Sequence, residues 1–131
     1  MNIDDKYILE IGQLLLRCED MVENEWDCVT IVYDVNEGHT ANSGFLYMKN
    51  EVLPTSASIK DEPLLFSDKI VEFQEIIYEE CGHKSKQLLI QMERETNRIK
   101  IDFEFDDASR WAIKPAKIKE MRETLRPDFS Q

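Results

Sequence analysis

Apolar residues recur along the chain at two spacings, and the change between them divides the sequence into helices and strands. Apolar positions three or four residues apart indicate a helix with one buried face, and strict alternation indicates a half-buried strand. Helices are predicted over residues 4–22, 67–81 and 114–125. Strands are predicted over residues 26–35, 43–49, 88–92 and 99–105, with a weaker strand over 53–59.

The clearest pattern is a hairpin formed by the last two predicted strands. Its second strand alternates apolar with charged residues, in the order Ile99, Lys100, Ile101, Asp102, Phe103, Glu104 and Phe105. Thr96 and Asn97 form the turn. One face of this hairpin is expected to be core and the other solvated and acidic, as in a one-sided antiparallel sheet. Replacing Phe103 is expected to cost about 3–5 kcal/mol of stability if its ring is fully buried.

Single residues mark the ends of the predicted elements. Asn36–Gly38 has the composition of a turn, and Pro54 favours an edge strand or a bulge. Ser67 is a candidate N-cap for the second long helix, and Gly82 stands where a left-handed residue would end it. Pro115 suits the first turn of the last helix.

Together these elements predict a single α+β domain over residues 1–131. The order is α-β-β-(β)-α-β-β-α, with an antiparallel sheet of four to five strands and helices packed on it. The chain has 131 residues, of which 42% are hydrophobic, and this is enough to form a core without disulfides or metals.

The charge of the chain limits its partners. The formal net charge is -11, from 27 acidic and 16 basic residues. Direct binding to nucleic acid or to an anionic membrane is disfavoured because both would repel such a surface. A basic protein partner is favoured. The negative charge is concentrated in residues 1–82, which carry a net of -13, whereas residues 83–131 carry +2.

Cysteine usage and hydropathy favour a cytoplasmic location. Cys18, Cys28 and Cys81 are odd in number and have no C-x-x-C spacing, so free thiols in a reducing compartment are expected. The N-terminal residues are polar and lack the apolar stretch of a signal peptide. No apolar run is long enough to span a membrane.

The residues that could carry chemistry favour a protein without catalytic activity or cofactors. Three carboxylates alternating on one strand face could hold Mg²⁺ or Ca²⁺, although a solvated strand face explains them more simply. They are Asp102, Glu104 and Asp106, with Asp107 beside the last. The two histidines stand in no zinc-binding array, and Cys81 near a helix C-terminus is poorly placed as a nucleophile. No nucleotide-binding or hydrolase motif is present.

The two tryptophans are candidate core residues. Trp26 opens the first strand, and Trp111 follows the acidic turn and precedes the last helix. For Trp111 a place in the core is favoured, and an exposed place beside the carboxylates stays open. There it would be a hot spot for a basic partner.

Several stretches resemble the YezG-like immunity proteins. They are E-W-D at 25–27, I-D-F-E-F-D-D at 101–107, W-x-x-x-P at 111–115 and L-R-P at 125–127. The resemblance spans most of the chain, although residues 38–63 contain no matching motif. It implies a small bacterial cytosolic antitoxin that blocks a polymorphic toxin, often a nuclease and hence basic. The family has no fixed inhibitory residues to carry over.

Charge and expected exposure, instead, select the candidate partner-binding residues. The first set is Asp102, Glu104, Asp106, Asp107 and Trp111, and the second is Glu72, Glu75 and Glu79 from the predicted helix over 67–81. Reversing the charge of Asp102 and Glu104 is expected to weaken binding and leave the fold intact. Two alternatives stay open, an acidic dimeric chaperone for a secreted effector and an enzyme with a carboxylate–metal site.

Overall fold

The computed structural model describes residues 4–35 and 40–129. Its helices are α1 (Asp5–Leu16), α2 (Glu19–Glu23), α3 (Leu65–Cys81) and α4 (Ile118–Thr124), the last preceded by a short 3₁₀ helix, η2 (Pro115–Lys117). Its strands are β1 (Cys28–Asp34), β2 (Ala41–Tyr47), β3 (Val52–Thr55), β4 (Gln87–Glu93) and β5 (Ile99–Glu104). The α+β prediction and its order of elements are confirmed.

The five strands form one antiparallel sheet in the order β3-β2-β1-β4-β5. The predicted hairpin is β4–β5, with Ile90 opposite Ile101. The weaker strand predicted over 53–59 is real but shorter, because pairing with β2 ends at Thr55. Pro54 lies in this edge strand, where its lack of a backbone N–H does not remove a hydrogen bond between the strands.

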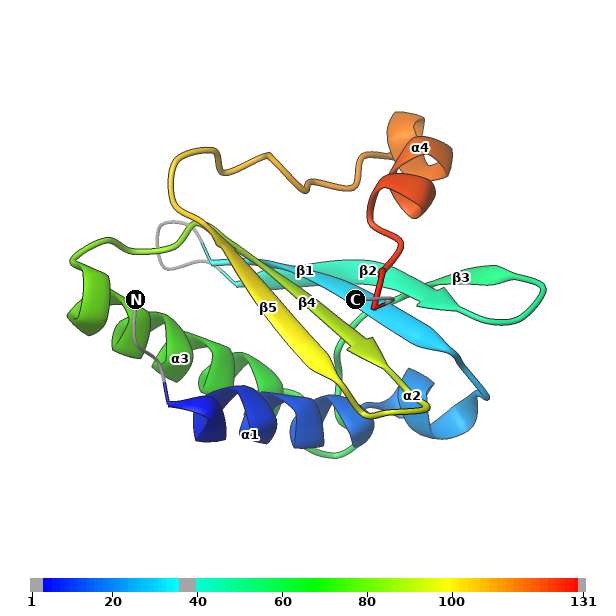
Figure 1. Cartoon of the computed structure of the whole chain (residues 1–131), viewed down its shortest axis with the longest axis horizontal. Coiled ribbons are helices and arrows are strands. Elements are labelled where there is room, and N and C mark those ends of the chain that lie inside the picture. Colours follow the sequence, from blue (N-terminus) through cyan, green and yellow to red (C-terminus); the bar gives the residue numbers. More distant parts are fainter. Residues whose placement is uncertain (1–3, 36–39, 130–131) are drawn as a thin grey trace.

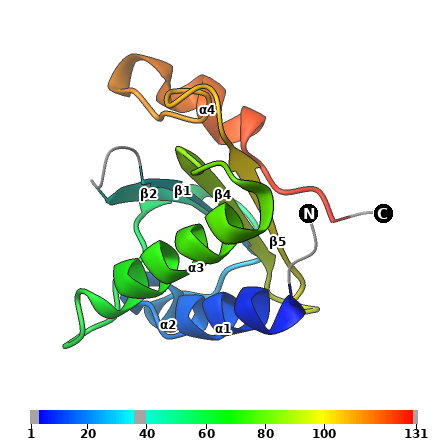
Figure 2. The same ribbon diagram turned by 90° about the vertical axis from the view of Figure 1, so that its left-hand side faces the viewer.

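Helices α1 and α3 cover one face of the sheet, as Figures 1 and 2 show. The apolar stripe of each helix packs on the odd-numbered side chains of β1, so that Leu15, Ile70 and Ile31 are fully buried. Gly12 allows α1 to approach β5, because a Cβ there would lie 3.3 Å from Cδ1 of Ile99. The absence of a side chain at residue 12 therefore permits close packing between α1 and β5.

The helix predicted over 4–22 is interrupted, and this part of the prediction is wrong. Cys18 has extended backbone angles (φ -64°, ψ 145°) and forms a β-bridge with Ile59. The N–H of Glu19 donates to the carbonyl of Ser58 at 2.8 Å. The apolar spacing continues through the break because Cys18 and Met21 still face the core, so periodicity alone does not reveal it.

The other predicted helix ends are mostly correct. Gly82 has φ 78° and its N–H donates to the carbonyl of Tyr78, as expected for a left-handed cap. Pro115 begins the 3₁₀ turn before α4. Ser67 is not the N-cap, because α3 begins two residues earlier and the Ser67 hydroxyl donates to the carbonyl of Leu64. The turn predicted at Asn36–Gly38 lies outside the described residues.

The second face of the sheet is covered by residues 105–129, which we call the C-terminal arm (Figures 1 and 2). Trp111 and Leu125 of the arm are 7% and 2% exposed and pack against Val32 and Leu89 of the sheet. The expectation that this face is solvated and acidic is therefore wrong for β4. It holds for Lys100 and Asp102 of β5, which are exposed.

Candidate protein-binding surfaces

Glu104 is the member of the first acidic set that the fold itself uses. It is 9% exposed, and its Oε2 accepts the backbone N–H groups of Asp106 and Asp107 at 2.9 and 3.0 Å. Nη1 of Arg110 donates to Oε1 at 2.9 Å. These hydrogen bonds, with that from Asp107 strongest, lower the pKa of Glu104 to about 2. Both oxygens of Glu104 are thus occupied by the loop that follows it.

The remaining acidic residues of this set differ from Glu104. Asp107 accepts the backbone N–H and the hydroxyl of Ser109, both at 2.9 Å, and these bonds lower its pKa. Asp102 and Asp106 are exposed. Within residues 4–35 and 40–129, no three acidic, histidine or cysteine side chains are grouped to hold a metal ion. The carboxylates that alternate in the sequence therefore do not converge on one point in the structure. The side chain of Glu104 instead forms hydrogen bonds with the loop that follows β5.

Trp111 lies in the core and not on the surface. Its backbone N–H donates to Oε1 of the buried Gln87 at 2.9 Å, and its ring lies beneath the guanidinium of Arg110, 4.9 Å from the ring centroid. The sequence left open whether Trp111 is buried or exposed, and in the structure it is buried. Its ring is therefore not accessible as an anchor for a partner.

The second acidic set lies on an exposed helix face. Glu72, Glu75 and Glu79 are solvent-exposed on α3, and each is about one turn from the next. Val71 and Tyr78 lie among them, 40% and 41% exposed. We call the exposed set on this helix the α3 face, which consists of Asp68, Val71, Glu72, Glu75, Tyr78 and Glu79.

Two lysines lie at the rim of the α3 face. Nζ of Lys69 donates to Glu10 at 2.8 Å and lies 3.6 Å from Glu72. Nζ of Lys84 lies 3.6 Å from Glu75 and 5.5 Å from the ring centroid of Tyr78. These surface pairs are weak, so a cationic partner can exchange with either lysine at little cost.

The loop that follows α3 contacts the loop that follows β5 at one end of the molecule. The rings of His83 and Phe105 are 6.4 Å apart, and Nζ of Lys86 donates to the carbonyl of Asp106 at 3.1 Å. Figure 1 shows the loop between α3 and β4 reaching the start of the C-terminal arm. The loop between α3 and β4 therefore packs against the start of the arm, and the α3 face is the larger exposed acidic surface of the two.

Sequence reasoning selected Glu72, Glu75 and Glu79 of the α3 face but not Asp68, and it missed the apolar members of the face. Val71 and Tyr78 are seven residues apart, which places them on one side of a helix. They belong to a different stripe from Phe66, Ile70, Phe73 and Ile77, which are buried. This second stripe is the signal that could have identified them.

The thiols of Cys18 and Cys28 are not activated. Burial is the largest cause that raises the pKa of Cys18 to about 12, and it also raises the pKa of Cys28. All three cysteines are free. None of the helices in the described residues is long and apolar enough to cross a membrane.

Comparison with protein-family models and with curated proteins found no match for this chain. The fold and its surfaces define an acidic α+β domain.

Proposed function

We propose that this chain is an immunity protein, which binds a basic toxin domain through the α3 face and blocks its active site. One observation carries the proposal: Tyr78 and Val71 are exposed in the middle of a helix face whose other members are carboxylates. Aromatic side chains are frequent anchors of protein interfaces, and surrounding charges select the partner. The resemblance of residues 99–127 to YezG-like immunity proteins agrees with this proposal.

The charge of the molecule supports a basic partner. α3 carries acidic residues at Asp68, Glu72, Glu75, Glu79 and Glu80 and a single base, Lys69. A toxin that cleaves nucleic acid needs a basic active-site surface to hold its polyanionic substrate. An acidic inhibitor is attracted to that same surface. The attraction speeds association and also directs the inhibitor to the active site that it blocks.

Growth protection tests the proposal. The chain is co-expressed with the toxin domain encoded beside its own gene, and survival of the cells is scored. We expect protection by the unmodified chain and loss of protection by Tyr78→Ala and by the pair Glu75→Lys and Glu79→Lys. Glu23→Lys on α2 is the matched control, because Glu23 is exposed on a different element.

Two results would contradict this proposal in different ways. Absence of protection by the unmodified chain removes the immunity function. Full protection by the α3 variants keeps that function and moves the interface to another surface.

The alternative function, a chaperone for a secreted effector, requires a different distribution of exposed apolar side chains. A chaperone of this kind holds unfolded chain on broad apolar grooves. The exposed large apolar side chains of the described residues are instead spread over several elements: Leu9, Val22, Leu64, Val71, Tyr78 and Ile118. Binding to an unfolded effector segment but not to a folded domain would favour the chaperone.

A further inference from the structure

Strand β5 presents an unpaired edge. It is the last strand of the sheet, and no other strand of the described residues pairs with its outer side. The backbone N–H groups of Glu93 and Lys86 donate to the carbonyls of Arg98 and Glu104, at 2.9 and 2.7 Å. Because alternate residues of an antiparallel strand face the same neighbour, the even-numbered residues face β4. Ile99, Ile101 and Phe103 therefore direct their N–H and C=O groups outward.

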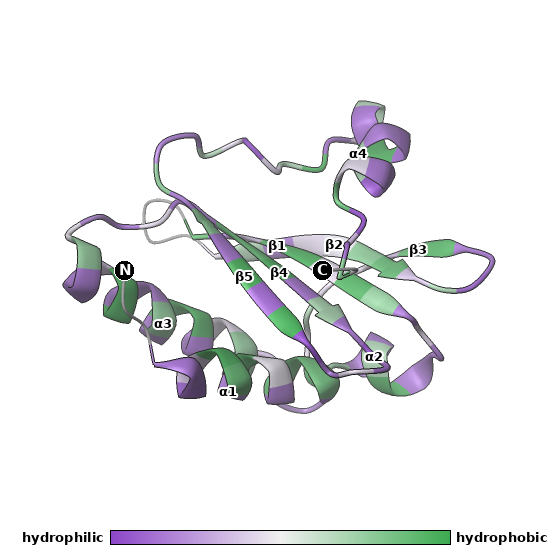
Figure 3. Cartoon of the chain, viewed as in Figure 1, coloured by the Kyte–Doolittle hydropathy of each residue, from purple (hydrophilic) through white to green (hydrophobic). Residues whose placement is uncertain are grey.

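The two edges of the sheet are protected to different degrees. The opposite edge strand, β3, is only 4 residues long and contains Pro54. β5 has 6 residues, no proline and no bulge. Figure 3 shows apolar and polar positions alternating along it. An edge of this length and pattern is a template for a further strand.

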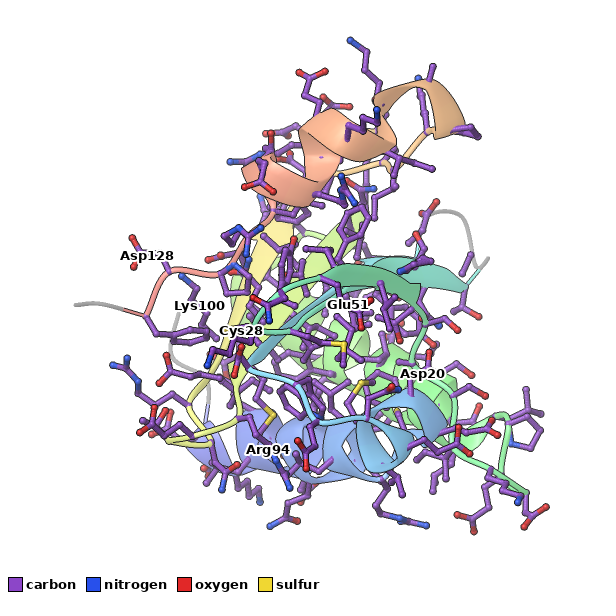
Figure 4. All side chains as sticks on the ribbon, turned by 90° about the vertical axis from the view of Figure 1, so that its right-hand side faces the viewer. Asp20, Cys28, Glu51, Arg94, Lys100 and Asp128 are labelled. Atoms are coloured by element: carbon purple, nitrogen blue, oxygen red, sulfur yellow. The ribbon has the colours of Figure 1, made fainter. Side chains whose placement is uncertain are left out.

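Space for a further strand exists beside the beginning of β5. A cavity of about 840 Å³ lies between Ile8 and Leu9 of α1, residues Arg98–Lys100, and Asp128 with Phe129 at the end of the arm. Nζ of Lys100 donates to the carbonyl of Asp128 at 3.2 Å, and Figure 4 shows these two residues on one side of the molecule. The arm and α1 thus form the walls of a groove beside the beginning of β5.

The charged residues of β5 are arranged so that one copy of the strand is complementary to a second, antiparallel copy. Lys100 and Asp102 stand on either side of Ile101 and are both exposed. If two copies of β5 run antiparallel with Ile101 opposite Ile101, Lys100 of each copy lies opposite Asp102 of the other. In this register Ile99 lies opposite Phe103, so every outward-facing residue meets another outward-facing residue.

Other registers are less favourable. A shift that pairs odd with even positions places outward-facing backbone groups opposite inward-facing ones. A symmetric shift that keeps this parity and centres on residue 100 or 102 places Lys100 or Asp102 opposite itself, and one centred on residue 99 or 103 places Lys100 opposite Arg98 or Asp102 opposite Glu104. Like charges directly opposite destabilise a strand pair, whereas opposite charges stabilise it. The register centred on Ile101 also places residues 102–104 of the second copy in the cavity beside Arg98–Lys100.

We propose that this chain forms a two-fold symmetric dimer in which β5 pairs antiparallel with β5 of a second copy, centred on Ile101. The two sheets then continue into one another, and the open edges are removed. The α3 face lies on the helical layer that covers one face of the sheet (Figure 2), and none of its residues belongs to β5. The dimer does not depend on the proposed immunity function.

Sedimentation of the full chain over a concentration series tests the dimer, with a reductant present because the cysteines are free. We expect a reversible shift towards twice the mass of 15.4 kDa. Lys100→Asp and Asp102→Lys should each raise the dissociation constant of the dimer roughly tenfold or more, because each replaces two attractive pairs by two repulsive ones. The double variant restores opposite charges and should restore dimerisation.

A matched control separates the register from charge alone. Lys119→Asp changes the charge of the exposed α4 by the same amount and should leave the dimer unchanged. Since Lys100 also binds the Asp128 carbonyl, Asp102→Lys is the cleaner single variant. A chain that stays monomeric at every concentration overturns the proposal. So does a dimer that the single variants leave intact, or one that the double variant does not restore.

Discussion

The carboxylate of Glu104 is held by three residues of the loop that follows it, and this makes the loop sensitive to pH. Its pKa is lowered to about 2, chiefly by the N–H of Asp107 and then by Asp106 and Arg110. A carboxyl group whose pKa is lower in the folded chain stabilises the fold above its unfolded pKa. That contribution is lost as the pH falls towards the folded pKa.

We therefore predict that Glu104→Gln is less stable than the unmodified chain at neutral pH. The difference should shrink as the pH falls from about 5 to about 2, since protonation removes the same charge from Glu104. Urea unfolding at several pH values measures this difference. A difference that does not change with pH would contradict the role assigned to Glu104. The earlier expectation that charge reversal here leaves the fold intact is replaced by this prediction.

Gly44 occupies a position in β2 where no side chain fits. A Cβ at this residue would lie 1.8 Å from the carbonyl oxygen of Thr30, a backbone atom that cannot move alone. We predict that Gly44→Ala destabilises the fold by about 3 kcal/mol or more. Gly12→Ala is the control, because its nearest contact is the side-chain end of Ile99 and alanine favours a helix. It should change stability by less than about 1 kcal/mol. Equal effects in thermal unfolding would contradict the prediction.

At the scale of elements, α3 and β5 are joined by aromatic packing. The rings of Phe73 and Phe103 have centroids 5.7 Å apart, but only Phe73 is fully buried, at 1% exposure. We predict a loss of about 3–5 kcal/mol for Phe73→Ala and a smaller loss, about 1–3 kcal/mol, for Phe103→Ala. The free energy of unfolding of the two variants measures this order. The reverse order would show that the end of β5 contributes more to the core than its exposure indicates.

The elements that were predicted correctly from the sequence are those that depend on residues close to one another in the chain. Alternation at 99–105 and the glycine at 82 each depend on neighbouring residues, and both were found as expected. The break at Cys18 depends on Ile59, which is 41 positions away, and no local spacing records that pairing. For the same reason the internal role of Glu104 was missed. Alternation indicates the face of a side chain, but not a loop that folds back onto that face.

At the scale of the whole molecule, the sheet is enclosed between two unequal layers (Figures 1 and 2). The helical layer contains the larger core, and the C-terminal arm completes a smaller one around Trp111 and Leu125. The carbonyl of Leu125 accepts the hydroxyl of Thr30 at 2.7 Å and the amide of Gln91 at 3.0 Å. Burial and these two bonds hold the end of α4 on β1 and β4.

We predict that Leu125→Ala costs about 2–5 kcal/mol and loosens the arm as a unit. Hydrogen exchange should then increase at Trp111 and Leu89, while α1 and α3 keep their protection. Ile118→Ala is the control, because Ile118 is 43% exposed on the same helix. Exchange that increases equally in α1 and α3 would indicate a single cooperative core instead.

The position of the arm in the chain has a consequence for synthesis. Every strand of the described residues precedes the arm, so a ribosome synthesises all five strands before the residues that cover the second face of the sheet. Until Trp111 and Leu125 have left the exit tunnel, Val32, Phe45 and Leu89 have no cover, and the nascent chain displays an apolar surface. A chain whose synthesis stops before the arm would therefore leave this apolar surface exposed, and such a surface favours chaperone binding and degradation.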